Sequence, residues 1–173
     1  QNPILSAEDL PWGRAWQTPH VIFDSDENLY KMWFIMADSK RDENNEVVFF
    51  TQKVGYATSV NGLNWEVHPH ALINGGRRPC VLKANPGSYR MWMNAAPDAQ
   101  GDFRSAARHI FGFSSTDGLD WTQDQEPAIR ATEKLRSVVY PFVRRNESDH
   151  TMWYGCHVEG GVFEIYSSTS ADG

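Results

Sequence analysis

One feature limits the folds open to this chain: a set of short motifs that occurs three times along the 173 residues, with copies about sixty residues apart. Each copy starts with a segment that has proline second, passes through a polar turn into a Met-Trp segment, and ends with a third apolar segment and an Asn-Gly or Asp-Gly turn. The Met-Trp segments lie at 30–34, 89–93 and 150–154. Recurrence of this kind predicts a fold built from repeated units.

The chemistry of each copy predicts β-strands. Runs rich in Val, Ile, Tyr, Phe and Trp favour strands, and Asn-Gly or Asp-Gly supplies the positive φ of a tight turn. The proline is expected to open each first strand, where its missing N–H disturbs the ladder least. The Met and Trp side chains are expected to pack between units. The sequence therefore predicts an all-β propeller of four-stranded antiparallel blades, with about three blades in this chain.

The repeat also predicts where each unit begins and ends. Residues 1–17 are expected to form a closing strand and a segment at the propeller mouth, and blade units follow at 18–73, 74–130 and 131–173. The third unit stops at Asp172-Gly173, before a fourth strand. Two alternatives stay open: the chain belongs to a longer propeller, or it forms a homo-oligomer that completes the ring.

Composition argues against several classes of partner. The net charge is −6 and no Lys/Arg stripe is present, which disfavours nucleic acid. The apolar runs are too short to span a membrane and no signal peptide is visible, so localisation is open, with a leaning to the extracellular or periplasmic space. His68 and His70 have no third ligand nearby, and no phosphate loop occurs, so neither a metal nor a cofactor is expected. Cys80 and Cys156 are expected to be half-buried free thiols.

Four motifs resemble those of a known group of proteins. They are Asn-Pro-Ile-Leu at 2–5, Pro-x-Val-Ile at 19–22, Tyr-Lys-Met-Trp at 30–33 and Gly-Tyr-Ala-Thr-Ser-x-Asn-Gly-x-x-Trp at 55–65. They look like the five-bladed propeller glycoside hydrolases, that is, the arabinanase, β-xylosidase and β-fructosidase-like enzymes and their mannoside-phosphorylase relatives. The resemblance covers nearly all of the chain and implies a carbohydrate substrate or ligand.

The same resemblance implies where catalytic acids would lie. In the arabinanase and xylosidase branch, it implies acidic residues directly before the proline of the first strands. Here those positions hold Thr18, Arg78 and Tyr140, none of which is a carboxylic acid. Either the acids lie in blades outside this chain, or other positions serve, or the propeller hydrolyses nothing.

Strand direction predicts a functional face without help from the resemblance. The starts of first strands and the ends of second strands lie on one face, the mouth, which carries the long loops. Glycoside hydrolysis needs two carboxyl groups across the scissile bond, and equivalent second-strand exits supply three candidates: Asp38, Asp98 and Glu159. Polar and aromatic rim residues are expected to bind sugar hydroxyls and ring faces: Arg14, Trp16, His20, Arg77, Arg78, Asn94, Tyr140 and His157.

The sequence therefore favours a carbohydrate-active propeller, a glycoside hydrolase or glycoside phosphorylase domain or fragment with paired carboxylates at its mouth. The alternative is a non-catalytic carbohydrate-binding propeller, because the acids expected before the prolines are absent. A third hypothesis is an oligomer-forming module.

Overall fold

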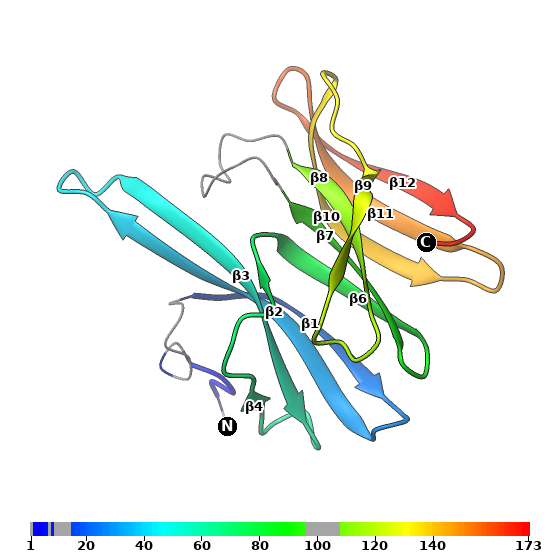
Figure 1. The fold of residues 1–173 in the computed structure, drawn as a ribbon. Coiled ribbons are helices and arrows are strands. Elements are labelled where there is room, and N and C mark those ends of the chain that lie inside the picture. The colour runs from blue at the N-terminus through cyan, green and yellow to red at the C-terminus, as the bar shows by residue number, and fades with distance from the viewer. Residues whose placement is uncertain (1, 7, 9–14, 96–107) are drawn as a thin grey trace.

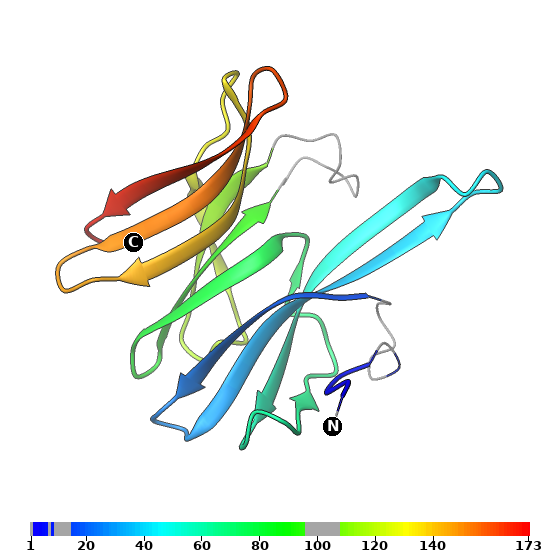
Figure 2. The same ribbon diagram turned by 180° about the vertical axis from the view of Figure 1, so that it is seen from behind.

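The computed structural model describes residues 2–6, 8, 15–95 and 108–173, and it consists of three antiparallel sheets that fan out side by side (Figures 1 and 2). The first sheet contains β1 (Ala15–Asp24), β2 (Leu29–Arg41), β3 (Val47–Ser59), β4 (Glu66–Val67) and β5 (Ile73–Asn74). The second contains β6 (Arg77–Asn85), β7 (Ser88–Ala95), β8 (His109–Ser115) and β9 (Thr122–Ile129). The third contains β10 (Leu135–Arg145), β11 (His150–Val158) and β12 (Phe163–Ser170).

These sheets confirm the predicted fold class. Within each sheet the strands follow one another in chain order, and each pair is antiparallel, as in the blades of a propeller. In the first sheet β4 and β5 both pair with β3, so the fourth strand is split in two. Within the described part of the chain, no helix is long and apolar enough to cross a membrane.

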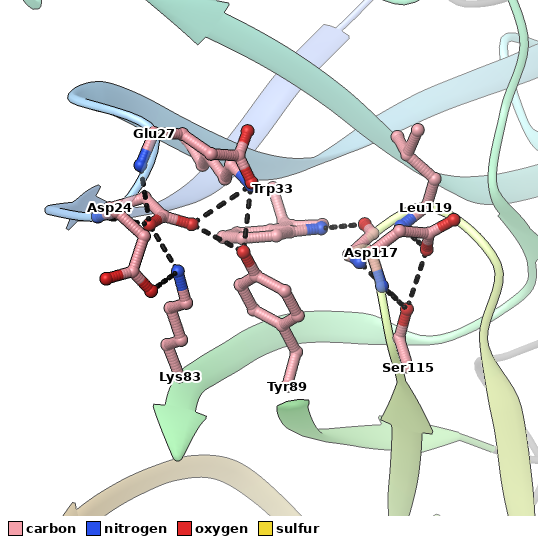
Figure 3. Close-up of polar contacts among 11 residues, drawn as sticks. Asp24, Glu27, Trp33, Lys83, Tyr89, Ser115, Asp117 and Leu119 are labelled. Carbon is pink, nitrogen blue, oxygen red and sulfur yellow. Dashed lines mark hydrogen bonds and ion pairs between the residues drawn. The ribbon is translucent and has the colours of Figure 1, made fainter. Parts of the chain in front are cut away.

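The Met-Trp residues pack between the sheets, as expected. Trp33 is fully buried in a cluster shared by the first and second sheets, and Trp92 is buried in a cluster shared by the second and third. The Asp-Gly turn of the following sheet packs against each indole. Trp33 Nε1 donates a hydrogen bond to the carbonyl of Gly118 at 2.9 Å (Figure 3), and a Cβ on Gly118 would lie 3.0 Å from the indole. Gly173 lies against Trp92 in the same way, at 3.1 Å.

The third Met-Trp segment differs from the other two. Trp153 is 40% exposed, whereas Trp33 and Trp92 are buried. No further sheet of the described chain covers this face of β11, and Phe142, Phe163 and Ile165 are exposed with it. The burial of each Trp therefore depends on the blade that follows it.

Two local expectations need correction. The prolines at 19, 79 and 141 lie inside the first strands, not at their starts, because β1, β6 and β10 begin earlier and shift register at these points. A bulge tolerates proline because one residue there leaves the ladder anyway. Cys80 and Cys156 are free thiols, but both are fully buried rather than half-buried.

The N-terminal residues also differ from expectation. Residues 2–6 form no strand in the structure. Leu5 instead packs against the outer face of the first sheet, beside Met32 and Phe34. Residues 2–6 therefore do not form the closing strand predicted within 1–17. The first strand, β1, begins at Ala15.

Candidate functional site

The three proline bulges meet around one pocket. The central strand β6 contacts both β1 and β10, which brings the first strands of all three sheets together. The pocket has a volume of about 260 Å³, and its described lining consists of residues 18–20, 78–80 and 140–142, one Xaa-Pro-Xaa segment from each sheet. Pockets for drug-sized ligands measure about 300–1,000 Å³, so this one, which we call the axial pocket, suits a smaller ligand.

The backbone is strained at the same place in all three segments. Thr18, Arg78 and Tyr140, each directly before its proline, have φ values of 46°, 55° and 61°. Such left-handed values are uncommon for residues other than glycine, and least expected for the β-branched Thr18. Strained residues cost about 1–3 kcal/mol each and cluster at binding and catalytic sites. The repetition of this strain around one pocket marks the pocket as the candidate site.

Arg78 and Tyr140 form the charged and aromatic part of the lining. The guanidinium carbon of Arg78 lies 3.8 Å from the centre of the Tyr140 ring, which is a cation–π stack. Within the described residues Arg78 forms no ion pair. The stack therefore holds a cation whose charge no described carboxylate neutralises.

Two further arginines lie at this end of the sheets. Arg77 is half-buried and lies opposite Asn94 in the β6–β7 ladder. Burial lowers the pKa of Arg77, and the positive charges of Arg108 and Arg78 lower it further. Arg108 sits at the seam between sheets, because its carbonyl accepts a hydrogen bond from the Val138 N–H at 3.0 Å. Arg77 is therefore within electrostatic reach of both Arg78 and Arg108.

His20 contributes a neutral imidazole to the axial pocket. Burial lowers its pKa, and the hydrogen bond to the Val81 carbonyl offsets this only in part. The Nε2 atom lies 2.9 Å from that carbonyl oxygen. Because a carbonyl only accepts, Nε2 carries the proton and Nδ1 keeps its lone pair. His20 therefore offers the pocket an acceptor, not a charge.

Two buried polar atoms near the pocket lack a partner. Asn94 is fully buried, and its Oδ1 accepts from the Tyr140 N–H at 3.4 Å while its Nδ2 has no hydrogen bond. The Oγ1 of Thr18 is also buried without a partner. Buried polar groups are nearly always hydrogen-bonded, so such exceptions need an explanation, of which a missing ligand or water is one.

The predicted catalytic acids lie outside the lining of the axial pocket. Asp38 lies inside β2 and not at its exit as predicted, because β2 continues to Arg41 and Asp38 pairs with Thr51 of β3. Its Oδ1 accepts a hydrogen bond from the Ser39 N–H at 2.9 Å. Glu159 follows β11, is exposed, and lines a separate pocket with Glu164 and Lys134. Asp98 lies outside the described residues. Their catalytic role stays a prediction.

The predicted sugar-binding residues fall into two groups. His20, Arg78 and Tyr140 line the axial pocket, and Arg77 and Asn94 lie beside it. Trp16 lies elsewhere: its indole N–H donates to the Ser6 carbonyl at 2.7 Å and its ring packs on Phe34. His157 is exposed with its ring 4.8 Å from that of Phe163, and Arg14 lies outside the described residues.

Sequence reasoning missed part of the lining. Cys80, Phe142 and the three prolines were assigned to strands and packing, yet they form the apolar wall of the axial pocket. The signal was present, since an Xaa-Pro pair recurs at the same place in all three copies. Among the residues that the structure describes, no group of three or more His, Cys, Asp or Glu is placed to hold a metal ion.

The arrangement suits recognition of a small polar ring. The pocket offers a guanidinium with several N–H donors, a phenol ring, an imidazole acceptor and an apolar wall. Sugars need this combination, because their hydroxyls require fixed donors and acceptors while their C–H faces pack on aromatic rings. The described lining contains no carboxylate, so it does not contain the pair of carboxyl groups that glycoside cleavage commonly uses.

Comparison with known sequences gives limited information. No family model matches the chain. Among curated proteins, the uncharacterized protein MT1551 of Mycobacterium tuberculosis (strain CDC 1551 / Oshkosh) is 30% identical over 112 residues, covering 61% of this chain and 33% of that protein. The chain therefore spans about a third of the length of this relative.

Solved structures are more informative about the fold. A glycoside hydrolase aligns with a TM-score of 0.71 at 18% identity, over 98% of this chain and 51% of its own. Zg3597, a family 117 glycoside hydrolase produced by the marine bacterium Zobellia galactanivorans, gives 0.71 at 14% identity, with 91% and 53% covered. A structure from the GH130 family of mannoside phosphorylases gives 0.65 at 14%, with 99% and 54% covered.

These similarities confirm the glycoside hydrolase-like β-propeller fold that the motifs predicted. At such identities they establish the fold alone. The chain spans about half the length of each of these proteins.

Proposed function

We propose that this chain is part of a carbohydrate-active propeller, a glycoside hydrolase or glycoside phosphorylase, which holds one sugar residue in the axial pocket. The observation that carries this proposal is the meeting of three equivalent strained segments at one small polar and aromatic pocket. Backbone strain repeated around a single cavity is costly, and it is expected where binding geometry requires it. The fold shared with glycoside hydrolases supports the carbohydrate ligand.

For cleavage, we assign the three acids that the sequence predicts on the mouth side of the second strands: Asp38, Asp98 and Glu159. Asp38 follows Ala37, which pairs with Ala15 at the start of β1, and Glu159 follows Val158, which pairs with Leu135 at the start of β10. Asp38, inside β2, and Glu159, just after β11, therefore both lie towards the end of their sheets at which β1 and β10 begin. A sugar in the axial pocket would extend from there towards these loops.

The test of catalysis is turnover of a panel of aryl glycosides and oligosaccharides, with and without inorganic phosphate, by the complete native protein. Replacing the residue that acts as general acid or base with its amide (Asp38→Asn, Asp98→Asn or Glu159→Gln) is expected to lower kcat by about 10²–10⁴-fold, the usual contribution of an acid–base group. Glu147→Gln is the matched control, because Glu147 is exposed in the turn at the opposite end of β10. Absence of turnover across the panel, or equal rates in all four variants, would contradict the proposal that this propeller is an enzyme.

A second candidate function is sugar binding without cleavage. It is favoured by one observation, the lack of any carboxylate in the described lining of the axial pocket. Calorimetry would then detect saccharide binding by the native protein that Tyr140→Ala weakens, while no substrate in the panel is turned over. Detectable hydrolysis or phosphorolysis that depends on one of the three acids excludes this candidate.

A further inference from the structure

Arg78 differs from the described basic side chains that pair with carboxylates. Lys31 and Lys83 pair with Asp24, Arg90 pairs with Asp124 at 2.8 Å, and Arg130 pairs with Glu126. Arg78 pairs with no carboxylate of the described chain, although it lines a pocket and stacks on a ring. A cation held in place without a counter-charge is a ready partner for an anionic group of a ligand.

The stack determines which part of Arg78 is offered. With Tyr140 at 3.8 Å from the guanidinium carbon, one face of the planar group is covered. Its N–H bonds point outwards in the plane, and this fork matches the two oxygens of a carboxylate. Because the ring and the strained backbone already restrain the side chain, little rotamer entropy remains to be lost on binding.

The surroundings select for negative charge. The chain as a whole is acidic, with net charge −6, yet the described lining of the axial pocket contains one arginine and no carboxylate. Arg77 lies within electrostatic reach of Arg78. A neutral sugar would leave the charge of Arg78 without a counter-charge from the described residues, whereas an anionic sugar neutralises it.

The rest of the lining favours a carboxylate over a phosphate. Besides Arg78 the pocket wall consists of three prolines, Cys80, Phe142, Tyr140, Thr18 and the neutral His20. One guanidinium fork satisfies both oxygens of a carboxylate and balances its single charge. A phosphate brings three oxygens and a charge of about −1.5 to −2, for which this wall supplies too few donors.

We propose that the axial pocket binds the carboxylate of an acidic sugar, a hexuronic acid residue, through a bidentate contact with Arg78 stacked on Tyr140. This inference rests on the proposed function, since it specifies the class of sugar held in the same pocket. It requires uronic acids to bind more tightly than the neutral sugars that differ only at that carbon.

Titration calorimetry on the native protein tests the inference with matched methyl glycosides: galacturonic acid against galactose, glucuronic acid against glucose, and mannuronic acid against mannose. Inorganic phosphate and acetate are titrated separately. At least one uronic acid is expected to bind about 10–100-fold more tightly than its neutral match, the range expected for a charge-assisted hydrogen-bonded pair. Arg78→Gln is expected to abolish that difference, and Arg78→Lys to restore only part of it, because lysine keeps the charge without the fork.

The control variant is Arg144→Gln, which removes an exposed arginine near the far end of β10. It is expected to bind uronic acids as the native protein does. Equal affinity for acidic and neutral sugars would overturn the inference and leave the proposed function standing, whereas failure of every saccharide to bind would overturn both. Tighter binding of phosphate than of any uronic acid, or an Arg144→Gln effect as large as that of Arg78→Gln, would also refute the carboxylate contact.

Discussion

Polar side chains are paired at one end of the first strands β1 and β6, whereas Thr18 and Arg78 at the other end are not. At the turn end of β1, Asp24 is fully buried, but it accepts hydrogen bonds from Lys83 and Tyr89 and pairs with Lys31 at 3.0 Å (Figure 3). At the mouth end of the same strand, Thr18 has a strained backbone and a buried hydroxyl without a partner. On β6 the same contrast separates Lys83, which is paired, from Arg78, which is not.

This difference indicates that the polar groups of the turn end stabilise the fold, whereas those of the mouth end are available for binding. Burial acts to raise the pKa of the Asp24 carboxyl, but the hydrogen bonds from Lys83, Tyr89 and Lys31 outweigh it and hold the pKa well below its usual range. Charges buried in this way stabilise only when all partners are present. At the mouth, unpaired groups and strain reduce stability, and they persist because the rest of each sheet enforces them. The turn end holds the blades together, and the mouth end is free to recognise a ligand.

The largest expected effect comes from breaking the turn end. Asp24→Asn leaves Lys31 and Lys83 close together without the carboxylate between them, and is expected to cost about 3–5 kcal/mol of unfolding free energy. Denaturant titration measures the loss. Asp26→Asn is the control, because Asp26 is half exposed and also contacts Lys83, at 2.7 Å. It is expected to cost about 0–1 kcal/mol, and similar losses in both variants would contradict the pairing account.

A second comparison measures how much the packing of the Trp33 indole against Gly118 contributes to stability. Gly118 and Gly62 occupy equivalent turns with φ of 81° and 72°, so alanine strains the backbone at both. Only at Gly118 would the new Cβ lie 3.0 Å from buried Trp33; at Gly62 the nearest atom is 3.8 Å away. Gly118→Ala is therefore expected to cost about 1–3 kcal/mol more than Gly62→Ala. Thermal unfolding of the two variants measures the difference, and equal shifts would show that the Trp33 contact is unimportant.

Low pH is expected to lower the unfolding free energy through protonation of Asp24 at the turn end. Its pKa is depressed in the folded state, so its contribution to stability is complete above the unfolded-state pKa of about 3.9 and is lost as pH falls below that value. One proton contributes a slope of at most about 1.4 kcal/mol per pH unit. Unfolding free energy measured between pH 5 and 3 should therefore fall less steeply in Asp24→Asn. Parallel curves for the variant and the native protein would be the contradictory result.

The smallest stability effect is expected at the mouth. Arg78 is exposed and has no ion pair among the described residues, so Arg78→Gln should change the unfolding free energy by less than about 0.5 kcal/mol. Denaturant titration beside Asp24→Asn measures this. A loss of several kcal/mol would mean that Arg78 is structural, and the contrast between the two ends would disappear.

How far the sequence predicts this molecule depends on the range of each interaction. The blades follow from local motifs, and burial of Trp33 and Trp92 follows from the repeat. Exposure of Trp153 does not, because it depends on whether another blade covers it. The positive φ of Thr18 and Tyr140 could not be predicted either, since no residue-type preference encodes it.

The candidate site was predictable only in part. The polar and aromatic residue types of the mouth directed attention to His20, Arg78 and Tyr140, all of which line the axial pocket. Trp16 has equally suitable chemistry but packs on the first sheet instead. The stacking of Arg78 on Tyr140 joins two different sheets, so only the folded structure reveals it.

The claim that the turn end stabilises the fold while the mouth end binds the ligand is tested most directly by saccharide titration calorimetry. Asp24→Asn and Arg78→Gln are compared side by side, at a temperature where both remain folded. The account predicts that Asp24→Asn, although much less stable, binds the preferred sugar as the native protein does. It predicts that Arg78→Gln, although nearly as stable as the native protein, loses most of that affinity. Native-like binding by Arg78→Gln, or loss of binding by folded Asp24→Asn, would contradict it.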